Sequence, residues 1–220
     1  MRVHFLEITT YTEFPAIQEF AAQEQFAILI HLKAPHVPAW LSTRAPLDLV
    51  TVLDVSGSMS GPRLALLKCA MRFVIENNDP SDCLSVVAFS SSACRLFPLR
   101  KMTAFGQQQS LQAVDSLIVN GGTNIAEGLR KAARVVEDRQ ARNPVCSIIL
   151  LSDGVDSHNL PQRDGSAPDY SPLVPCSILP GSEHHIPIHA FGFGMDHDSR
   201  EMHIVAQMSS GTFSFIDTWW

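Results

Sequence analysis

From residue 47 onward, short apolar runs of strand length alternate with stretches in which apolar residues recur at helical spacing. The run over 47–53 is apolar at nearly every position, as in strands that helices cover on both faces. Comparable strand-like runs follow at 84–89, 145–151, 186–191 and 212–216. This alternation predicts an α/β fold with a Rossmann-like, doubly wound and mostly parallel sheet.

The helices that we expect between these strands carry recognisable start and stop signals. Pro62 suits the first position of a helix, and Asn124 and Glu127 form the N-x-x-E pattern of a helix start. Gly211 follows the last helical stretch, where a glycine commonly caps a helix. These signals place helices over about 62–76, 111–118, 125–136 and 199–208.

Three segments depart from the alternation. The run 94–99 follows the second strand directly and contains Pro98, which favours one antiparallel strand at a sheet edge. Residues 1–45 hold β-like stretches without helical periodicity, so we interpret them as an N-terminal β extension before a main domain over 46–220. The proline-rich stretch 156–185 has little periodicity and is interpreted as a loop insertion that helps to select a partner.

Composition excludes several classes of function. Lys plus Arg is 16 and Asp plus Glu is 22, a net charge of −6, which argues against a nucleic-acid or anionic-membrane partner. The apolar runs are far shorter than the ~20 residues of a membrane span, and no secretory signal is visible. Five cysteines without a C-x-x-C pair indicate neither a disulfide framework nor a zinc finger. We therefore expect an intracellular, cytoplasmic protein.

Oxygen-bearing side chains gather where the strands are expected to end. Asp54, Ser56 and Ser58 follow the first strand, Thr123 precedes a helix and Asp153 follows the 145–151 strand. Ligands of open α/β sheets bind at the carboxyl ends of the strands, and a spacing of two in an extended turn aims side chains the same way. Such oxygens suit Mg²⁺ or Mn²⁺ rather than zinc. An ion held by these residues keeps at least one coordination position, normally filled by water, that a carboxylate from another protein can take.

The motifs D-x-S-G-S, G-G-T-N and S-D-G, which contain these five residues, resemble the metal-ion-dependent adhesion site of von Willebrand factor A domains. The resemblance spans about residues 47–217. It implies direct metal contacts from Ser56, Ser58 and Thr123, and contacts made partly through water from Asp54 and Asp153. It also implies a protein-binding module whose partner offers an Asp or Glu carboxylate.

Longer stretches, such as LALLKCAMRFVI and NGGTNIAEGLRKAARVVEDR, resemble the plant WAVY GROWTH 3-like proteins, which carry a RING finger and act as E3 ubiquitin ligases. A RING finger needs paired Cys and His ligands around zinc, and this sequence lacks such pairs. We therefore expect no enzyme activity from this chain, but recruitment of substrates or association with RING-bearing relatives. The sequence ends soon after the last strand, where the family ordinarily adds a closing helix, so we expect one sheet face to be less covered.

A second class of function also places an acid after the first strand. In magnesium-dependent phosphotransfer, Asp54 would be the nucleophile. Haloacid-type phosphatases have another Asp two residues later, whereas this chain has Ser56, so the general acid that the chemistry needs is missing. The sequence therefore favours metal-dependent protein binding over phosphotransfer.

Overall fold

A computed structural model describes residues 7–14, 26–33, 44–153, 156–158, 171–193 and 199–216. The chain divides into two compact units, Met1–Arg44 and Ala45–Trp220. In the first unit, β1 (Glu7–Thr12) and β2 (Ile28–Lys33) form an antiparallel pair that places Ile8 opposite Leu32. Both of these side chains are more than half exposed. A two-stranded hairpin with an exposed apolar face is at best marginally stable by itself.

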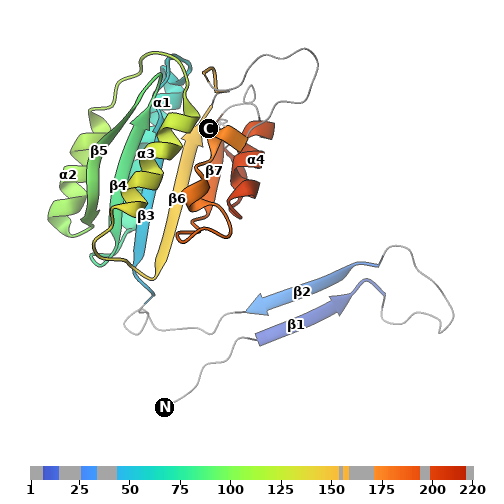
Figure 1. Ribbon diagram of the computed structural model, residues 1–220. Coiled ribbons are helices and arrows are strands. Elements are labelled where there is room, and N and C mark those ends of the chain that lie inside the picture. Colours follow the sequence, from blue (N-terminus) through green and yellow to red (C-terminus); the bar gives the residue numbers. More distant parts are fainter. Residues whose placement is uncertain are drawn as a thin grey trace, which may run out of the picture. The chain divides into compact units, whose positions relative to one another are not determined.

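The second unit contains a six-stranded sheet (Figure 1). Its strands in chain order are β3 (Leu47–Asp54), β4 (Cys83–Phe89), β5 (Ala93–Lys101), β6 (Val145–Ser152), β7 (Ile188–Phe193) and β8 (Phe213–Ile216). The spatial order is β5-β4-β3-β6-β7-β8, and every neighbouring pair is parallel except β4 and β5. The predicted α/β class, with a mostly parallel sheet and one antiparallel edge strand, is confirmed.

Helices cover the sheet from both sides (Figure 1). They are α1 (Pro62–Asn77), α2 (Ala104–Asp115), α3 (Ile125–Glu137) and α4 (Ser199–Met208). Val50 and Val52 of β3 belong to the buried cluster under α3 and α4, whereas Leu49 and Leu53 belong to the cluster under α1 and α2. Side chains alternate between the two faces of a strand, so a doubly covered strand is apolar at successive positions.

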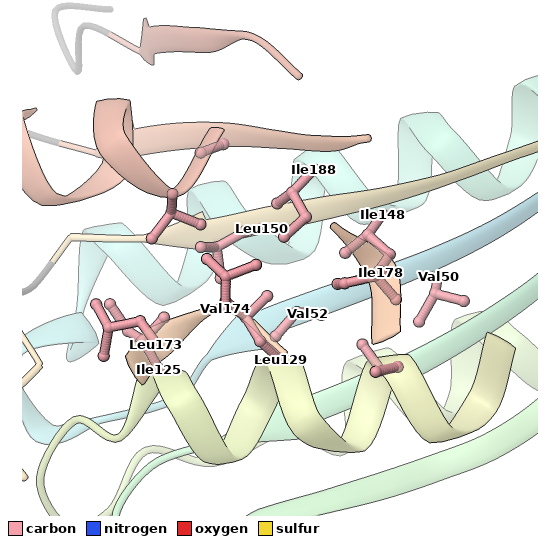
Figure 2. Close-up of a cluster of buried hydrophobic side chains, with 14 of the residues drawn as sticks. Val50, Val52, Ile125, Leu129, Ile148, Leu150, Leu173, Val174, Ile178 and Ile188 are labelled. Carbon is pink, nitrogen blue, oxygen red and sulfur yellow. The ribbon is translucent and has the colours of Figure 1, made fainter. Parts of the chain in front are cut away.

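Part of the predicted loop insertion belongs to the core. Two short 3₁₀ helices, η3 (Ser171–Leu173) and η4 (Cys176–Ile178), lie within it. Leu173, Val174 and Ile178 are buried in the cluster that contains Leu129 of α3 (Figure 2). These apolar residues are spaced irregularly between prolines, so sequence periodicity did not indicate their burial. Residues 159–170 of the insertion lie outside the described part of the chain.

The opposite face of the sheet carries an apolar groove of about 400 Å³ between α1 and the strands β6, β7 and β8. Phe73 of α1, Phe191 and Phe193 of β7, and Ile216 of β8 are among the residues that line it. Phe73 is 68% exposed, whereas Phe193 is fully buried. In the described part of the chain, α2 packs against α1 and β5, at the edge of the sheet opposite β8.

None of the helices in the described residues is both long enough and apolar enough to cross a membrane. The five cysteines are free thiols. Burial raises the pKa of the Cys146 thiol to about 11, and it is also the main cause that raises the pKa of Cys83. Because the thiolate is the reactive form, both side chains are expected to be poor nucleophiles at neutral pH.

A buried ion pair joins the end of α3 to the start of β3. Asp48 is 1% exposed, and its Oδ2 accepts hydrogen bonds from Arg139 Nη1 at 3.0 Å and from the backbone N–H of Asn143 at 3.1 Å. Charged hydrogen bonds in such surroundings contribute more than exposed ones, because an unpaired partner stays desolvated.

We therefore expect Asp48→Asn to lower the free energy of unfolding by about 2 kcal/mol, measured by urea denaturation. The matched control is Asp115→Asn, which removes a pair with Arg72 in which both side chains are about half exposed. That control should change stability by less than about 0.5 kcal/mol. Equal effects of the two substitutions would contradict a special role of the buried pair.

Candidate functional site

The site lies where the chain order in the sheet reverses. From β3 the chain passes through α1 to β4 on one side, and later through α3 to β6 on the other side. The carboxyl ends of β3 and β6 lie side by side, because the two strands are parallel and paired up to Leu53 and Leu151. Asp54 ends β3, and Asp153 follows the end of β6. Such a switch point is the usual ligand position in open α/β sheets.

The Asp54 carboxylate is fully buried and held by two donors. Its Oδ1 accepts a hydrogen bond from the backbone N–H of Ser56 at 2.8 Å, and its Oδ2 accepts one from the Ser152 hydroxyl at 2.5 Å. Burial raises the pKa of Asp54, the charge of Asp153 raises it further, and the hydrogen bonds from Ser152 and Ser56 lower it. The carboxylate is therefore fixed in orientation, but its negative charge is unfavourable without a nearby cation.

The turn after β3 brings two hydroxyls between the two carboxylates. Ser56 precedes a 3₁₀ helix, η2 (Gly57–Met59), whose buried Met59 donates its N–H to the Ser56 carbonyl at 3.0 Å. The oxygens Ser56 Oγ and Ser58 Oγ lie 2.9 Å apart, and the Ser58 hydroxyl donates to Asp153 Oδ1 at 2.9 Å. The expectation of an extended turn is wrong for this segment: a helical turn, rather than extended alternation, brings the two hydroxyls together.

Thr123 lies in a loop whose backbone is joined to the turn after β3. The Asn120 N–H donates to the Val55 carbonyl at 2.8 Å, and the Gly57 N–H donates to the Gly121 carbonyl at 3.0 Å. Thr123 itself is 7% exposed. In the described part of the chain, the hydrogen bonds that connect Asp54, Ser56, Ser58 and Asp153 do not include the Thr123 side chain.

Three residues of this site were not predicted from the sequence. Arg63, in the first turn of α1, forms an ion pair with Asp153 Oδ2 and donates to the Ser58 carbonyl at 3.3 Å. Ser152 orients Asp54, as described above. The Ser157 N–H donates to the Thr123 carbonyl at 2.9 Å. Among the three, only Arg63 could have been suspected from the sequence. A cation in the first turn of a helix interacts unfavourably with the helix dipole, so its presence there suggests a partner elsewhere.

Two buried acids support the loop beyond Asp153. Asp156 is 2% exposed and Glu201 of α4 is fully buried. The Asp156 N–H lies 3.1 and 3.2 Å from the two Glu201 carboxylate oxygens, and the Asp156 carboxylate accepts from the backbone N–H groups of Ala126 and His158. These contacts attach the segment after β6 to α3 and α4.

This chain is similar in sequence to a known domain family and to plant proteins. The family model of the von Willebrand factor type A domain matches residues 49–155. E3 ubiquitin-protein ligase WAV3 from Arabidopsis thaliana is 49% identical over 114 residues, covering 51% of this chain and 15% of that protein. E3 ubiquitin-protein ligase WAVH1 from the same plant is 39% identical over 144 residues, covering 59% of this chain and 21% of that protein. The chain thus spans a small part of the length of these relatives.

Solved structures show the same fold at low sequence identity. A von Willebrand factor type A protein from Catenulispora acidiphila has a TM-score of 0.66 and 20% identity, covering 97% of this chain and 46% of that chain. Proximal thread matrix protein 1 from the mussel byssus, with a zinc-occupied MIDAS motif, has a TM-score of 0.59 and 23% identity, covering 78% of this chain and 41% of that chain. The match to the family model shows a von Willebrand factor type A domain over residues 49–155 of this chain, and the solved structures share its fold.

Proposed function

We propose that this chain is a non-catalytic protein-binding module that captures a partner carboxylate through a divalent cation. Asp54, Ser56, Ser58, Thr123 and Asp153 would hold the cation. The observation that carries the proposal is the chain of hydrogen-bonded groups between the two buried acids, from Ser56 through Ser58 to Asp153, beside the fixed carboxylate of Asp54.

The donor chemistry fits a hard divalent cation. All of the proposed ligand atoms are oxygens, which Mg²⁺ and Mn²⁺ prefer. The two carboxylates supply the negative charge, while the hydroxyls are neutral and leave the cation electrophilic. When bound, the cation supplies a position at which an Asp or Glu of the partner replaces water. A similar fold holds zinc in the mussel protein, so binding should be measured for Mg²⁺, Mn²⁺ and Zn²⁺ side by side.

The same geometry disfavours the phosphotransfer alternative. A nucleophilic carboxylate needs an oxygen that substrate can reach, but Asp54 is fully buried and both of its oxygens accept hydrogen bonds. Two residues later, Ser56 lies against another hydroxyl and supplies no general acid. We therefore propose that Asp54 orients and charges a binding site rather than attacking a substrate.

The plant relatives suggest a setting for such a module. WAV3 and WAVH1 are named as E3 ubiquitin-protein ligases, and this chain matches only a part of each. We propose that the module recruits protein substrates in that setting or associates with RING-bearing relatives, with no ligase activity of its own. Because the chain has a net charge of −6, an acidic partner would be repelled without the cation. Partner capture should therefore depend strongly on the metal.

Affinity capture from plant extract, read by mass spectrometry, tests this function. We expect a set of partners that is retained with Mg²⁺, released by a chelator and recovered when excess Mg²⁺ is restored. The variant Asp54→Asn should lack this set, whereas Asp115→Asn, at an exposed acid away from the site, should retain it. The same partners with and without chelator would contradict metal-dependent capture. For a partner that is found, replacement of its contacting acid should abolish binding.

A further inference from the structure

Arg63 has a position that helix stability does not explain. It is the second residue of α1, and no acidic side chain lies in the first turn of that helix. The N-terminus of a helix carries partial positive charge, so a cation there is electrostatically unfavourable. The compensation for this placement must come from contacts outside the helix.

Those contacts are with the site described above. Arg63 Nη1 pairs with Asp153 Oδ2 and lies 3.3 Å from the Ser58 carbonyl oxygen. The Asp153 side chain is fully buried, and that of Arg63 is 30% exposed. The other Asp153 oxygen, Oδ1, accepts from the Ser58 hydroxyl. Both oxygens of this buried acid are therefore satisfied by the protein's own groups, one of them a full positive charge.

We propose that Arg63 is the internal counter-ion of the site, which neutralises Asp153 in the metal-free protein and opposes the binding of a divalent cation. This proposal rests on the proposed function, because it concerns the affinity of the same site. A cation that uses Asp153 must share its carboxylate with the guanidinium or displace it, and the two positive charges repel each other. Asp54, by contrast, accepts hydrogen bonds from a backbone N–H and a hydroxyl, which carry no net charge.

Two consequences follow from this arrangement. Removal of the guanidinium should strengthen cation binding, because the competitor and its repulsion are lost. It should also destabilise the metal-free protein, because a buried carboxylate then lacks its counter-charge. A cation that takes over the neutralisation should restore that stability.

Isothermal titration with Mg²⁺ tests the first consequence. We expect Arg63→Gln to bind Mg²⁺ about tenfold more tightly than the unmodified protein, a change of roughly 1.4 kcal/mol. Arg63→Lys, which keeps the positive charge, should stay within about threefold of the unmodified protein, roughly 0.7 kcal/mol. Arg72→Gln is the matched control on the same helix, since Arg72 pairs with the half-exposed Asp115, and it should leave the affinity unchanged.

Thermal unfolding tests the second consequence without requiring any partner. In chelator, Arg63→Gln should melt at a lower temperature than the unmodified protein, and saturating Mg²⁺ should close that gap. Tighter Mg²⁺ binding by Arg63→Gln supports the proposal even where the unmodified protein shows no measurable heat.

The outcomes separate this proposal from the proposed function. If the unmodified protein binds Mg²⁺ and Arg63→Gln binds it equally or more weakly, the role of Arg63 is overturned while the metal site stands. If neither protein binds Mg²⁺, Mn²⁺ or Zn²⁺, both proposals fail.

Discussion

Replacement of Asp54 by Asn is expected to weaken Mg²⁺ binding at least about 100-fold, roughly 2.7 kcal/mol, with the fold retained. Asn has nearly the same shape, and its oxygen can accept the hydrogen bond from the Ser56 N–H that now reaches Asp54 Oδ1 at 2.8 Å. What the substitution removes is one of the two negative charges that would hold the cation. Isothermal titration gives the affinity, and circular dichroism checks the fold.

The same variant should keep or gain stability in chelator. Burial raises the pKa of Asp54, which means that the folded protein disfavours the charged form. The free-energy cost of burying the charged Asp54 carboxylate is fully present above the raised pKa. This cost disappears as the pH falls and the carboxyl takes up its proton. The melting temperature of Asp54→Asn relative to the unmodified protein should therefore be highest near neutral pH and should decline on acidification.

Asp115→Asn serves as the control for these measurements, because it removes an equal charge from an exposed position. Its Mg²⁺ affinity should match that of the unmodified protein. Unchanged Mg²⁺ affinity in Asp54→Asn would show that the binding of the cation does not depend on the Asp54 carboxylate.

Replacement of Gly211 by Ala is expected to destabilise the protein by more than about 4 kcal/mol, the range of the most disruptive single substitutions. A Cβ atom at this position would lie 1.8 Å from the carbonyl oxygen of Ile188 and 2.5 Å from its carbonyl carbon. Both obstacles are backbone atoms at the start of β7, so the segment between α4 and β8 would have to move away from β7. Urea denaturation of the purified variant, or its failure to accumulate as folded protein, gives the measurement.

Gly181→Ala is the comparison for this substitution. Gly181 has φ +88°, and a Cβ there would meet no atom within 4 Å. Only the strain of the left-handed conformation remains, about 1–2 kcal/mol. If Gly211→Ala were no more harmful than Gly181→Ala, the close approach of the backbone to Ile188 would not be the limiting contact.

Local sequence signals predicted the structure correctly where the interactions that they indicate lie within one helix or strand. The Asn124 side chain accepts from the Glu127 N–H at 3.0 Å, as the N-x-x-E pattern predicted for the start of α3. Pro62 begins α1, where its missing N–H has no helical partner to lose. The strand alternation likewise predicted the sheet, because burial on both faces requires apolar residues at successive positions.

The end of α4 shows where such signals fail. Gly211 was expected to cap the helix through its conformational freedom, but Ser210 adopts the left-handed conformation, with φ +60°. The Gly211 N–H does close the helix end by donating to the Ala206 carbonyl at 2.8 Å. A glycine is needed at 211 because β7 passes close to it, which is a contact between elements that sequence spacing does not show.

Strand alternation is a local pattern, so it was enough to predict the fold class, and oxygen-bearing side chains at strand ends were enough to select the candidate site residues. How those side chains meet depends on the packing of the folded chain. The 3₁₀ turn brings the hydroxyls of Ser56 and Ser58 together, and the packing of α1 brings Arg63 to Asp153 across 90 positions of the chain. The physical reason is that ion pairs and close backbone contacts depend on distances in space, which the packing of helices on a sheet sets and residue spacing does not.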